Sequence, residues 1–259
     1  MLSPGQITDD SEMAIAMLRS IHQEGRFIQK KVFDAYLDWI HSGPFDVGMT
    51  IGQALLSGSK NTNSQSNGAL MRLAPLAIYG TGISEEELCT IARQDAEITH
   101  ANKTVSDINM LMALVMAQAI KTGCTHQDLY EYLLERARTL RVEETILTLL
   151  ETSSTEPPRI CDGSTQGWVK IAFSLSVFHL VNTTSFEDAV VRTIMRGGDT
   201  DTNGAIVGAL MGSLLGAENI PLQWRGTVLS CKPDDLSPTP RPERYWARQG
   251  YDLACCLWQ

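Results

Sequence analysis

Helical periodicity is the feature of this sequence that most restricts its fold. Apolar residues recur at three- and four-residue spacing in one segment after another, as Met13, Ala16, Met17 and Ile21 do. No segment of any length alternates apolar and polar residues as a half-buried strand does. We therefore predict an all-α fold of about ten helices, with residues 1–259 forming a single compact globular domain. The spacing places helices over residues 11–24, 27–40, 50–56, 84–99, 104–121, 126–140, 142–151, 168–181 and 185–195, with one more directly after Gly68, one after Asp199 and a short last one after Pro242.

One helix stands out because it is apolar on almost every side. Residues 104–121 are rich in Met and Ala, which predicts a buried central helix. A second apolar helix follows Asp199 and carries Gly204, Gly208, Gly212 and Gly216 at every fourth position. Glycine at this spacing falls on nearly one face and costs helix stability, about 1 kcal/mol each against Ala. We therefore expect a neighbouring helix to approach this face very closely.

The stretch before that glycine-rich helix carries the clearest chemistry. Asp199, Asp201 and Thr202 place two carboxylates and a hydroxyl within four residues, directly after Gly197 and Gly198. Such a cluster belongs at a helix N-terminus, where exposed N–H groups face oxygen anions. Carboxylate and hydroxyl oxygens suit Mg²⁺ or Mn²⁺ better than Zn²⁺. An ordinary N-cap is the alternative interpretation of this cluster taken alone.

A second cluster of the same kind lies near the N-terminus. Thr8, Asp9 and Asp10 open an apolar-periodic helix in the same way that Asp199 to Thr202 do. So many carboxylates at adjoining helix ends need cations between them. We therefore predict that the two ends of the domain meet and share one site.

At this point the sequence resembles the ADP-ribosylglycohydrolase family, which includes the dinitrogenase-reductase-activating glycohydrolase and the ADP-ribosylarginine hydrolases. The similarity lies in the two acidic clusters, residues 7–13 and 197–203, and in residues 45–50, 66–75 and 98–100. It extends in the family's order from about Thr8 to Trp224. The Gly-Gly-Asp-Thr-Asp-Thr element is its most specific part, whereas Phe-Asp-Val-Gly or Thr-His alone is weak.

The resemblance implies an all-helical fold with metals in a central cleft. It implies hydrolysis of the N-glycosidic bond between ADP-ribose and a modified protein side chain, with arginine the preferred linkage. It also implies two divalent cations, Mg²⁺ or Mn²⁺, bound by Thr8, Asp9, Asp10, Asp199, Asp201 and Thr202. Asp46 matches the loop carboxylate that faces the scissile bond in arginine-specific members, so we expect Asp46, Asp10 and Asp199 to be catalytic. A simple loop cap is the alternative role for Asp46.

Two polar loops are candidates for contacts with the substrate. Residues 57–68 contain almost no apolar side chain and are either a loose surface excursion or a phosphate-binding loop. The resemblance favours phosphate binding, and implies that ADP-ribose lies against Ser66, Asn67, Gly68, Ala69 and Met71. His100 is a weaker candidate for the cleft wall, because a lone His at a helix C-terminus is commonly a cap. Residues 153–167 form a second loop, which we expect to be a lid or rim.

Composition restricts the compartment and the partners. A net charge of −9 without any Lys/Arg run argues against nucleic-acid binding. The six cysteines form no Cys-x-x-Cys pair, which is typical of a reducing cytoplasm. The most apolar run, residues 205–217, is too short to span a bilayer. We expect a cytoplasmic monomer that acts on ADP-ribosylated proteins and contacts neither nucleic acid nor membrane.

One difference from the family leaves alternatives open. Family members usually begin with an additional apolar helix carrying a Gly-Asp-Ala-Leu-Gly-like turn, whereas seven residues precede Thr8 here. From this difference we expect weakened activity or a seam filled by another chain. The alternatives to arginine-directed hydrolysis are an ADP-ribose-binding or structural protein without turnover, and hydrolysis of serine-linked or O-acetyl ADP-ribose.

Overall fold

The computed structural model describes residues 2–257, and the elements within that range are helical throughout. The α-helices are α1 Asp9–Glu24, α2 Gln29–His41, α3 Met49–Ser57, α4 Ala74–Gly80, α5 Glu85–Thr99, α6 Lys103–Thr122, α7 His126–Thr139, α8 Glu144–Ser153, α9 Val169–Asn182, α10 Phe186–Ile194, α11 Thr200–Leu215, α12 Leu222–Ser230 and α13 Ala247–Leu257. Four short 3-10 turns are η1 Asn67–Ala69, η2 Gly163–Thr165, η3 Ala217–Asn219 and η4 Glu243–Tyr245. The only extended pairing in this range is an isolated bridge between Ser66 and Trp168. The predicted all-α fold is confirmed.

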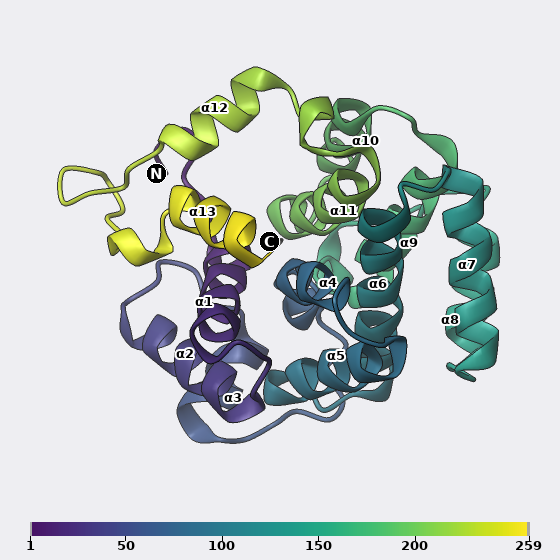
Figure 1. Ribbon diagram of the computed structural model, residues 1–259, viewed down its shortest axis with the longest axis horizontal. Helices are drawn as coiled ribbons and strands as arrows, with labels where there is room; N and C mark the ends of the chain where they lie inside the picture. The colour runs from purple at the N-terminus through teal and green to yellow at the C-terminus, as the bar shows by residue number, and fades with distance from the viewer. Residues whose placement is uncertain (1, 258–259) are drawn as a thin grey trace.

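Helix α6 is the centre of the hydrophobic core, as its all-round apolarity predicts. Its buried residues run almost without interruption from Thr104 to Ala117. Helices α4, α5, α7, α9 and α11 all pack against it (Figure 1). Asn102 caps its first turn by accepting hydrogen bonds from the backbone N–H groups of Thr104 and Val105. These five helices are thus arranged around one buried helix.

Helix α1 brings the start of the chain to its later parts. It packs against α2 and α4, against α13 near the C-terminus, and against α11 (Figure 1). Its buried apolar face includes Met13, Met17 and Ile21, the residues whose spacing predicts the helix. The contact with α11 matters for function, because the two acidic clusters begin these two helices.

Two helices differ from the sequence-based expectation. Helix α4 begins only at Ala74, because Asn67–Ala69 form a 3-10 turn where we expected the helix to start soon after Gly68. Helix α12 is not predicted at all, since none of its residues is buried and no apolar stripe marks it.

The glycine-rich face of α11 packs on α10, but the contact does not require glycine. A Cβ built on Gly208 would lie 3.8 Å from the Phe186 ring and from Val190, and one on Gly212 would lie 3.7 Å from Phe186. These are ordinary van der Waals distances. The predicted contact with a neighbouring helix is therefore present, but at distances that alanine would also allow. Gly216 does end the helix, with φ +81°.

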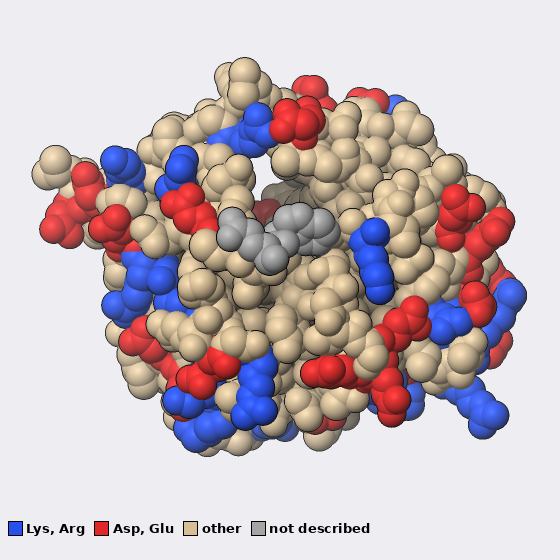
Figure 2. Space-filling view, viewed as in Figure 1, with Lys and Arg blue, Asp and Glu red and all other residues tan. Residues whose placement is uncertain are grey.

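Charges of both signs are distributed over the surface. On the face shown in Figure 2, Lys and Arg are interspersed with Asp and Glu around the edge of the molecule. Within residues 2–257, no helix has the length and apolarity needed to cross a membrane.

Candidate functional site

Two helix N-termini form one wall of the candidate site. Helix α1 begins at Asp9, directly after its N-cap Thr8, and helix α11 begins at Thr200, directly after its N-cap Asp199. The two helices contact each other, and Asp9, Asp199 and Asp201 line the same cleft. Asp10 faces Thr202, whose hydroxyl stabilises the carboxylate and opposes part of the rise in the pKa of Asp10 that burial causes. The structure therefore brings together the two clusters that the sequence places at opposite ends of the chain.

The electrostatics of this wall favour protons or cations. Burial, followed by the charges of Asp10, Asp46 and Asp201, raises the pKa of Asp9 to about 8. Burial raises the pKa of Asp10 to about 6, although the Thr8 hydroxyl opposes the shift. Burial also raises the pKa of Asp199. None of the ion pairs between described side chains involves these carboxylates. Their negative charge is thus balanced by no Lys or Arg side chain in residues 2–257.

The donor set fits a hard divalent cation in its chemistry. All its potential ligands are carboxylate or hydroxyl oxygens, which Mg²⁺ and Mn²⁺ prefer. Asp10 Oδ1 is buried without a hydrogen-bond partner among the described residues, so its lone pairs remain available. However, no three His, Cys, Asp or Glu side chains in the described part of the chain lie close enough to form a complete binding group. Like-charged carboxylates repel one another until a cation lies between them.

A cleft of about 360 Å³ opens beside this wall. Asp46, an exposed residue of the loop before α3, also lines this cleft. The cleft is lined by Asp9, Asp46, Gly48, Met49, Thr50, Ile51, Ser66, Asn67, Gly68, Met71, Gln166, Gly167, Asp199, Asp201 and Thr202. The cleft therefore combines carboxylates of α1, α11 and the loop before α3 with small polar residues of the 66–68 segment.

The segment at residues 66–69 is anchored on three sides. Asn67 donates its backbone N–H to the Gly167 carbonyl at 2.9 Å, and Val169 donates to the Gln65 carbonyl at 2.8 Å. The Asn67 side chain donates from Nδ2 to Asp199 Oδ2 at 2.8 Å. From below, Arg72 Nη1 donates to the Gly68 carbonyl at 3.4 Å. Residues 57–63 are thus exposed on the surface, whereas residues 66–69 are built into the cleft.

His100 lies behind the cleft and not on its surface. Its imidazole is fully buried, with Nε2 2.7 Å from Ser66 Oγ and Nδ1 2.8 Å from Thr99 Oγ1. Burial, followed by the charge of Arg72, lowers the pKa of His100 to about 3, so the ring is neutral at physiological pH. Its backbone N–H donates to the Ala96 carbonyl, which is the C-cap role that its position in the sequence suggests. His100 therefore orients Ser66, which does line the cleft.

The two glycines before Asp199 let the chain turn against a neighbouring loop. Gly197 and Gly198 both have φ +74°, a backbone conformation that favours glycine. A Cβ on Gly198 would lie 1.7 Å from the Cys161 carbonyl oxygen, so the loop between α8 and α9 packs directly on this turn. The same loop supplies Gln166 and Gly167 to the cleft, as expected of a rim.

The sequence profile of the ADP-ribosylglycohydrolase family matches residues 1–249. The chain belongs to this family. Membership makes it an ADP-ribosyl glycohydrolase, a hydrolytic enzyme, and confirms the resemblance seen in the two acidic clusters.

Several relatives support this assignment. A protein of Acanthamoeba polyphaga mimivirus, also named as an ADP-ribosyl glycohydrolase, is 31% identical over 256 residues, covering 89% of this chain and 77% of the relative. The ADP-ribosyl-dinitrogen reductase glycohydrolase of Rhodospirillum rubrum is 27% identical, with coverage of 86% and 74%. An ADP-ribosylarginine hydrolase of Pseudomonas putida is 23% identical, with coverage of 86% and 62%.

A solved structure shows the same fold. The protein of an ADP-ribosylglycohydrolase-related complex superposes with a TM-score of 0.79 over 98% of this chain and 82% of its own, at 24% identity. At this identity the likeness establishes the helical architecture of this family member and not its substrate.

The cleft includes most, but not all, of the residues that the sequence nominates. Asp10 and Thr8 lie in the turn directly behind Asp9, and Ala69 is buried behind Gly68. His100 is likewise set back from the surface of the cleft. The nominated residues that line it are Asp9, Asp46, Ser66, Asn67, Gly68, Met71, Asp199, Asp201 and Thr202.

Sequence reasoning missed six lining residues of this family member. Gln166 and Gly167 could have been predicted, because they end the loop that we expected to form a rim of the cleft. Gly48, Met49 and Thr50 belong to the 45–50 stretch that resembles the family, although only Asp46 of that stretch was nominated, and Ile51 had no signal because it lies in an ordinary short helix. Met49 is 92% exposed, so it forms the outer edge of the cleft.

Proposed function

We propose that this protein hydrolyses the N-glycosidic bond between ADP-ribose and an arginine side chain of a modified protein, with the help of two divalent cations. One observation carries the proposal: carboxylates of both acidic clusters and Asp46 line a single cleft together with the polar 66–68 segment. The names of the Rhodospirillum and Pseudomonas relatives support an ADP-ribosylated protein and an arginine linkage, respectively.

The carboxylate end of the cleft is the proposed cation site. Mg²⁺ or Mn²⁺ would be held there by Thr8, Asp9, Asp10, Asp199, Asp201 and Thr202. When bound, such ions orient the ribose hydroxyls and lower the pKa of a coordinated water. These residues lie at two helix N-termini, where the exposed backbone N–H groups stabilise part of their negative charge.

Asp46 has a different proposed role from the other carboxylates. It comes from a loop and not from α1 or α11, yet its charge reaches Asp9 and raises the pKa of that residue. Cleavage of a bond to ribose develops positive charge at the anomeric carbon, and the departing guanidine needs a proton. An exposed carboxylate at the mouth of the cleft can stabilise a guanidinium and move that proton. We assign Asp46 this orienting and acid/base role.

The 66–69 segment is the proposed site of the diphosphate and the ribose. Its rigid anchoring to Gly167 and Asp199 fixes the backbone without a ligand, which reduces the entropy lost on binding. Ser66 offers a hydroxyl whose orientation is set by neutral His100. Asn67, Gly68, Ala69 and Met71 complete the segment, and the small residues leave room for a bulky anion.

The decisive experiment is hydrolysis of defined peptides. Peptides carrying arginine-linked or serine-linked ADP-ribose are incubated with the protein in added Mg²⁺, in Mn²⁺ and in chelator. We expect release of ADP-ribose from the arginine peptide only when a divalent cation is present. Asp199→Ala should lower the rate by more than about 100-fold, because it removes a proposed ligand together with the acceptor of the Asn67 hydrogen bond. Asp235→Ala, which removes an exposed carboxylate that does not line the cleft, is the matched control.

A second function, ADP-ribose binding without turnover, is favoured by one observation. The carboxylates of residues 2–257 do not form a complete cation-binding group on their own. This second function would be supported if calorimetry detects ADP-ribose binding while both peptides stay intact in every metal condition. Turnover of the serine-linked peptide instead would select a different linkage for the same cleft.

A further inference from the structure

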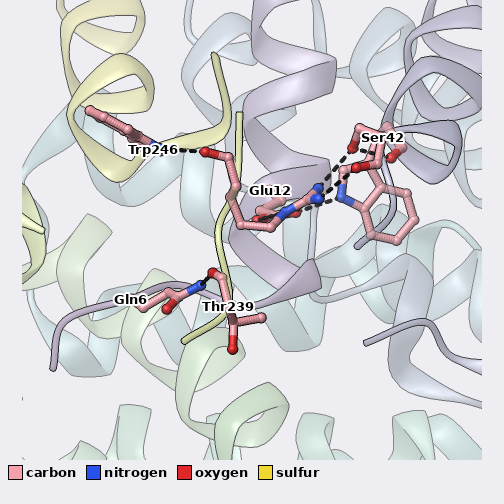
Figure 3. Close-up of polar contacts among 7 residues, drawn as sticks. Gln6, Glu12, Ser42, Thr239 and Trp246 are labelled. Atoms are coloured by element: carbon pink, nitrogen blue, oxygen red, sulfur yellow. Dashed lines mark hydrogen bonds and ion pairs between the residues drawn. The ribbon is translucent and has the colours of Figure 1, made fainter. Parts of the chain in front are cut away.

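Arg241 forms a buried junction between two elements that lead into the cleft. Its side chain is 1% exposed, as is that of Glu12. Arg241 Nε donates to Glu12 Oε1 and Nη2 donates to Glu12 Oε2, both at 2.8 Å, which is a bidentate ion pair (Figure 3). The same guanidinium reaches Ser42, donating from Nη1 to its carbonyl at 3.0 Å and from Nη2 to its Oγ at 2.8 Å (Figure 3).

The Glu12 side of this junction controls the first turn of α1. The Glu12 backbone N–H donates to the Thr8 carbonyl at 3.0 Å, so Glu12 and Thr8 belong to the same helical turn. Asp9 and Asp10 lie between them. Trp39 Nε1 donates to Glu12 Oε2 at 2.8 Å and completes the carboxylate's partners. Fixing the Glu12 side chain therefore fixes the rotation of the turn that carries both carboxylates.

The Ser42 side controls the start of the loop that carries Asp46. Ser42 is the C-cap of α2, and Asp46 follows four residues later. The chain turns between them at Gly43, with φ +70°. A guanidinium that holds both the carbonyl and the hydroxyl of Ser42 determines where this turn begins.

Arg241 is held in place by the segment that carries it. Its backbone N–H donates to the Pro233 carbonyl at 2.7 Å, and its own carbonyl accepts from Trp246 Nε1 at 2.8 Å (Figure 3). Gln6 Nε2 donates to the Thr239 carbonyl at 2.7 Å and ties the residues before Thr8 to the same segment (Figure 3). The segment between α12 and η4 is thus fastened to the start of α1 at two places.

We propose that Arg241 is a positioning residue that sets Asp46 relative to Asp9 and Asp10, a role that rests on the proposed hydrolase function. Arg241 does not line the cleft and acts only through Glu12 and Ser42. A buried ion pair is weak evidence for stability, because desolvation offsets most of its attraction. What the pair contributes is a fixed geometry, because the planar guanidinium of Arg can hold two partners at fixed angles and the ammonium of Lys cannot.

The test compares Arg241→Lys with a control variant of the distant core. Lys keeps the charge but cannot hold Glu12 and Ser42 together. Leu150→Ala opens a cavity in α8 and destabilises the fold without changing the Glu12 side or the Ser42 side of the junction. Calorimetry with Mn²⁺ alone measures cation affinity, and kcat and KM are measured on the arginine-linked peptide. We expect Arg241→Lys to lose about 10- to 100-fold in both Mn²⁺ affinity and kcat, with Leu150→Ala unchanged in both.

Ser42→Ala tests the Ser42 side of the junction separately from the Glu12 side, and it replaces Arg241→Lys as the test variant if Arg241→Lys does not fold. It removes the Oγ that accepts from Arg241 and donates to the Trp39 carbonyl at 2.6 Å, and it leaves the Arg241–Glu12 pair in place, so we expect kcat to fall several-fold at unchanged Mn²⁺ affinity. Wild-type kcat in Ser42→Ala, or Arg241→Lys that matches Leu150→Ala in affinity and kcat, overturns the positioning role. If the wild-type chain leaves the peptide intact, the proposed function fails, and the Mn²⁺ comparison of Arg241→Lys with Leu150→Ala still decides the positioning of Asp9 and Asp10.

Discussion

Asn67 and Asp199 lie 132 positions apart in the chain, and Asn67 Nδ2 donates to Asp199 Oδ2 at 2.8 Å. The bond joins the 66–69 segment to the N-cap of α11 and so holds the two sides of the cleft together. Burial raises the pKa of Asp199, and the bond from Asn67 is the first of the influences that oppose this rise. Asn67 therefore favours an ionised Asp199.

Replacing Asn67 should move the pH dependence of hydrolysis. In Asn67→Ala, Asp199 loses a donor and its pKa rises further, so the acid limb of the pH–rate profile should shift to higher pH. A hydrogen bond to a charged group contributes about 1.5–3 kcal/mol, which corresponds to a loss of roughly 10- to 100-fold in kcat/KM. Asn61→Ala, an exposed position on the same loop, should leave the profile unchanged. An unshifted acid limb in Asn67→Ala would contradict this role.

The metal-free protein should become less stable as the pH rises. The folded pKa values of Asp9 and Asp10, about 8 and about 6, lie above the ordinary value of 3.8 that they regain on unfolding. Between these values the folded state binds more protons than the unfolded state, so the free energy of unfolding falls with increasing pH.

Thermal unfolding measures this effect directly. We expect the Tm in chelator to be several degrees lower at roughly pH 8 than at roughly pH 5, since about 1 kcal/mol changes the Tm of a chain this size by about 2–4 °C. Added Mn²⁺ should raise the Tm most at the higher pH, because ionised carboxylates bind it. Asp9→Asn should reduce the dependence on pH. A Tm in chelator that rises over this range would refute the assignment.

Two glycine substitutions near the site should have opposite effects. Gly208→Ala adds a methyl group at 3.8 Å from its nearest neighbours and improves helix propensity, so we expect a gain of up to about 1 kcal/mol in the free energy of unfolding. Gly198→Ala places a Cβ 1.7 Å from the Cys161 carbonyl oxygen at φ +74°, so we expect a loss of stability and of hydrolysis. Urea denaturation of both variants checks the pair. Equal stability of the two would show that the loop does not pack on this turn.

Removing Arg72 should destabilise the support of the 66–69 segment. Arg72 and Asp95 are both fully buried and joined at 3.1 Å, with Tyr36 OH donating to the other Asp95 oxygen at 2.7 Å. Arg72→Met leaves the Asp95 charge unpaired, which we expect to cost about 3–5 kcal/mol of unfolding free energy.

A double variant and a surface control make this prediction specific. Arg72→Met combined with Asp95→Asn should unfold at higher urea concentration than Arg72→Met alone, because no charge is then left unpaired. Lys30→Met removes an exposed pair with Asp34 and a contact with the Phe33 ring at 5.8 Å, and should change stability by less than about 1 kcal/mol. A double variant no more stable than the single one would indicate that the ion pair is not what Arg72 contributes.

The sequence by itself determined most of the helical elements and both acidic clusters. Apolar spacing and caps are local properties, so they identified the buried helix α6 and the helices that follow Thr8 and Asp199. Helix α12 buries no residue and lacks these local signals, so it could not be predicted from the sequence.

Only the tertiary structure decided how these elements make a site. The hydrogen bond from Asn67 to Asp199 and the ion pair between Arg241 and Glu12 join residues 132 and 229 positions apart. No periodicity encodes such pairs, because they depend on how α1, α11 and the C-terminal segment pack around α6. Burial likewise placed His100 behind Ser66 and raised the pKa values of Asp9 and Asp10. The sequence shows which residue types are present, but their burial and the distances between them arise only on folding.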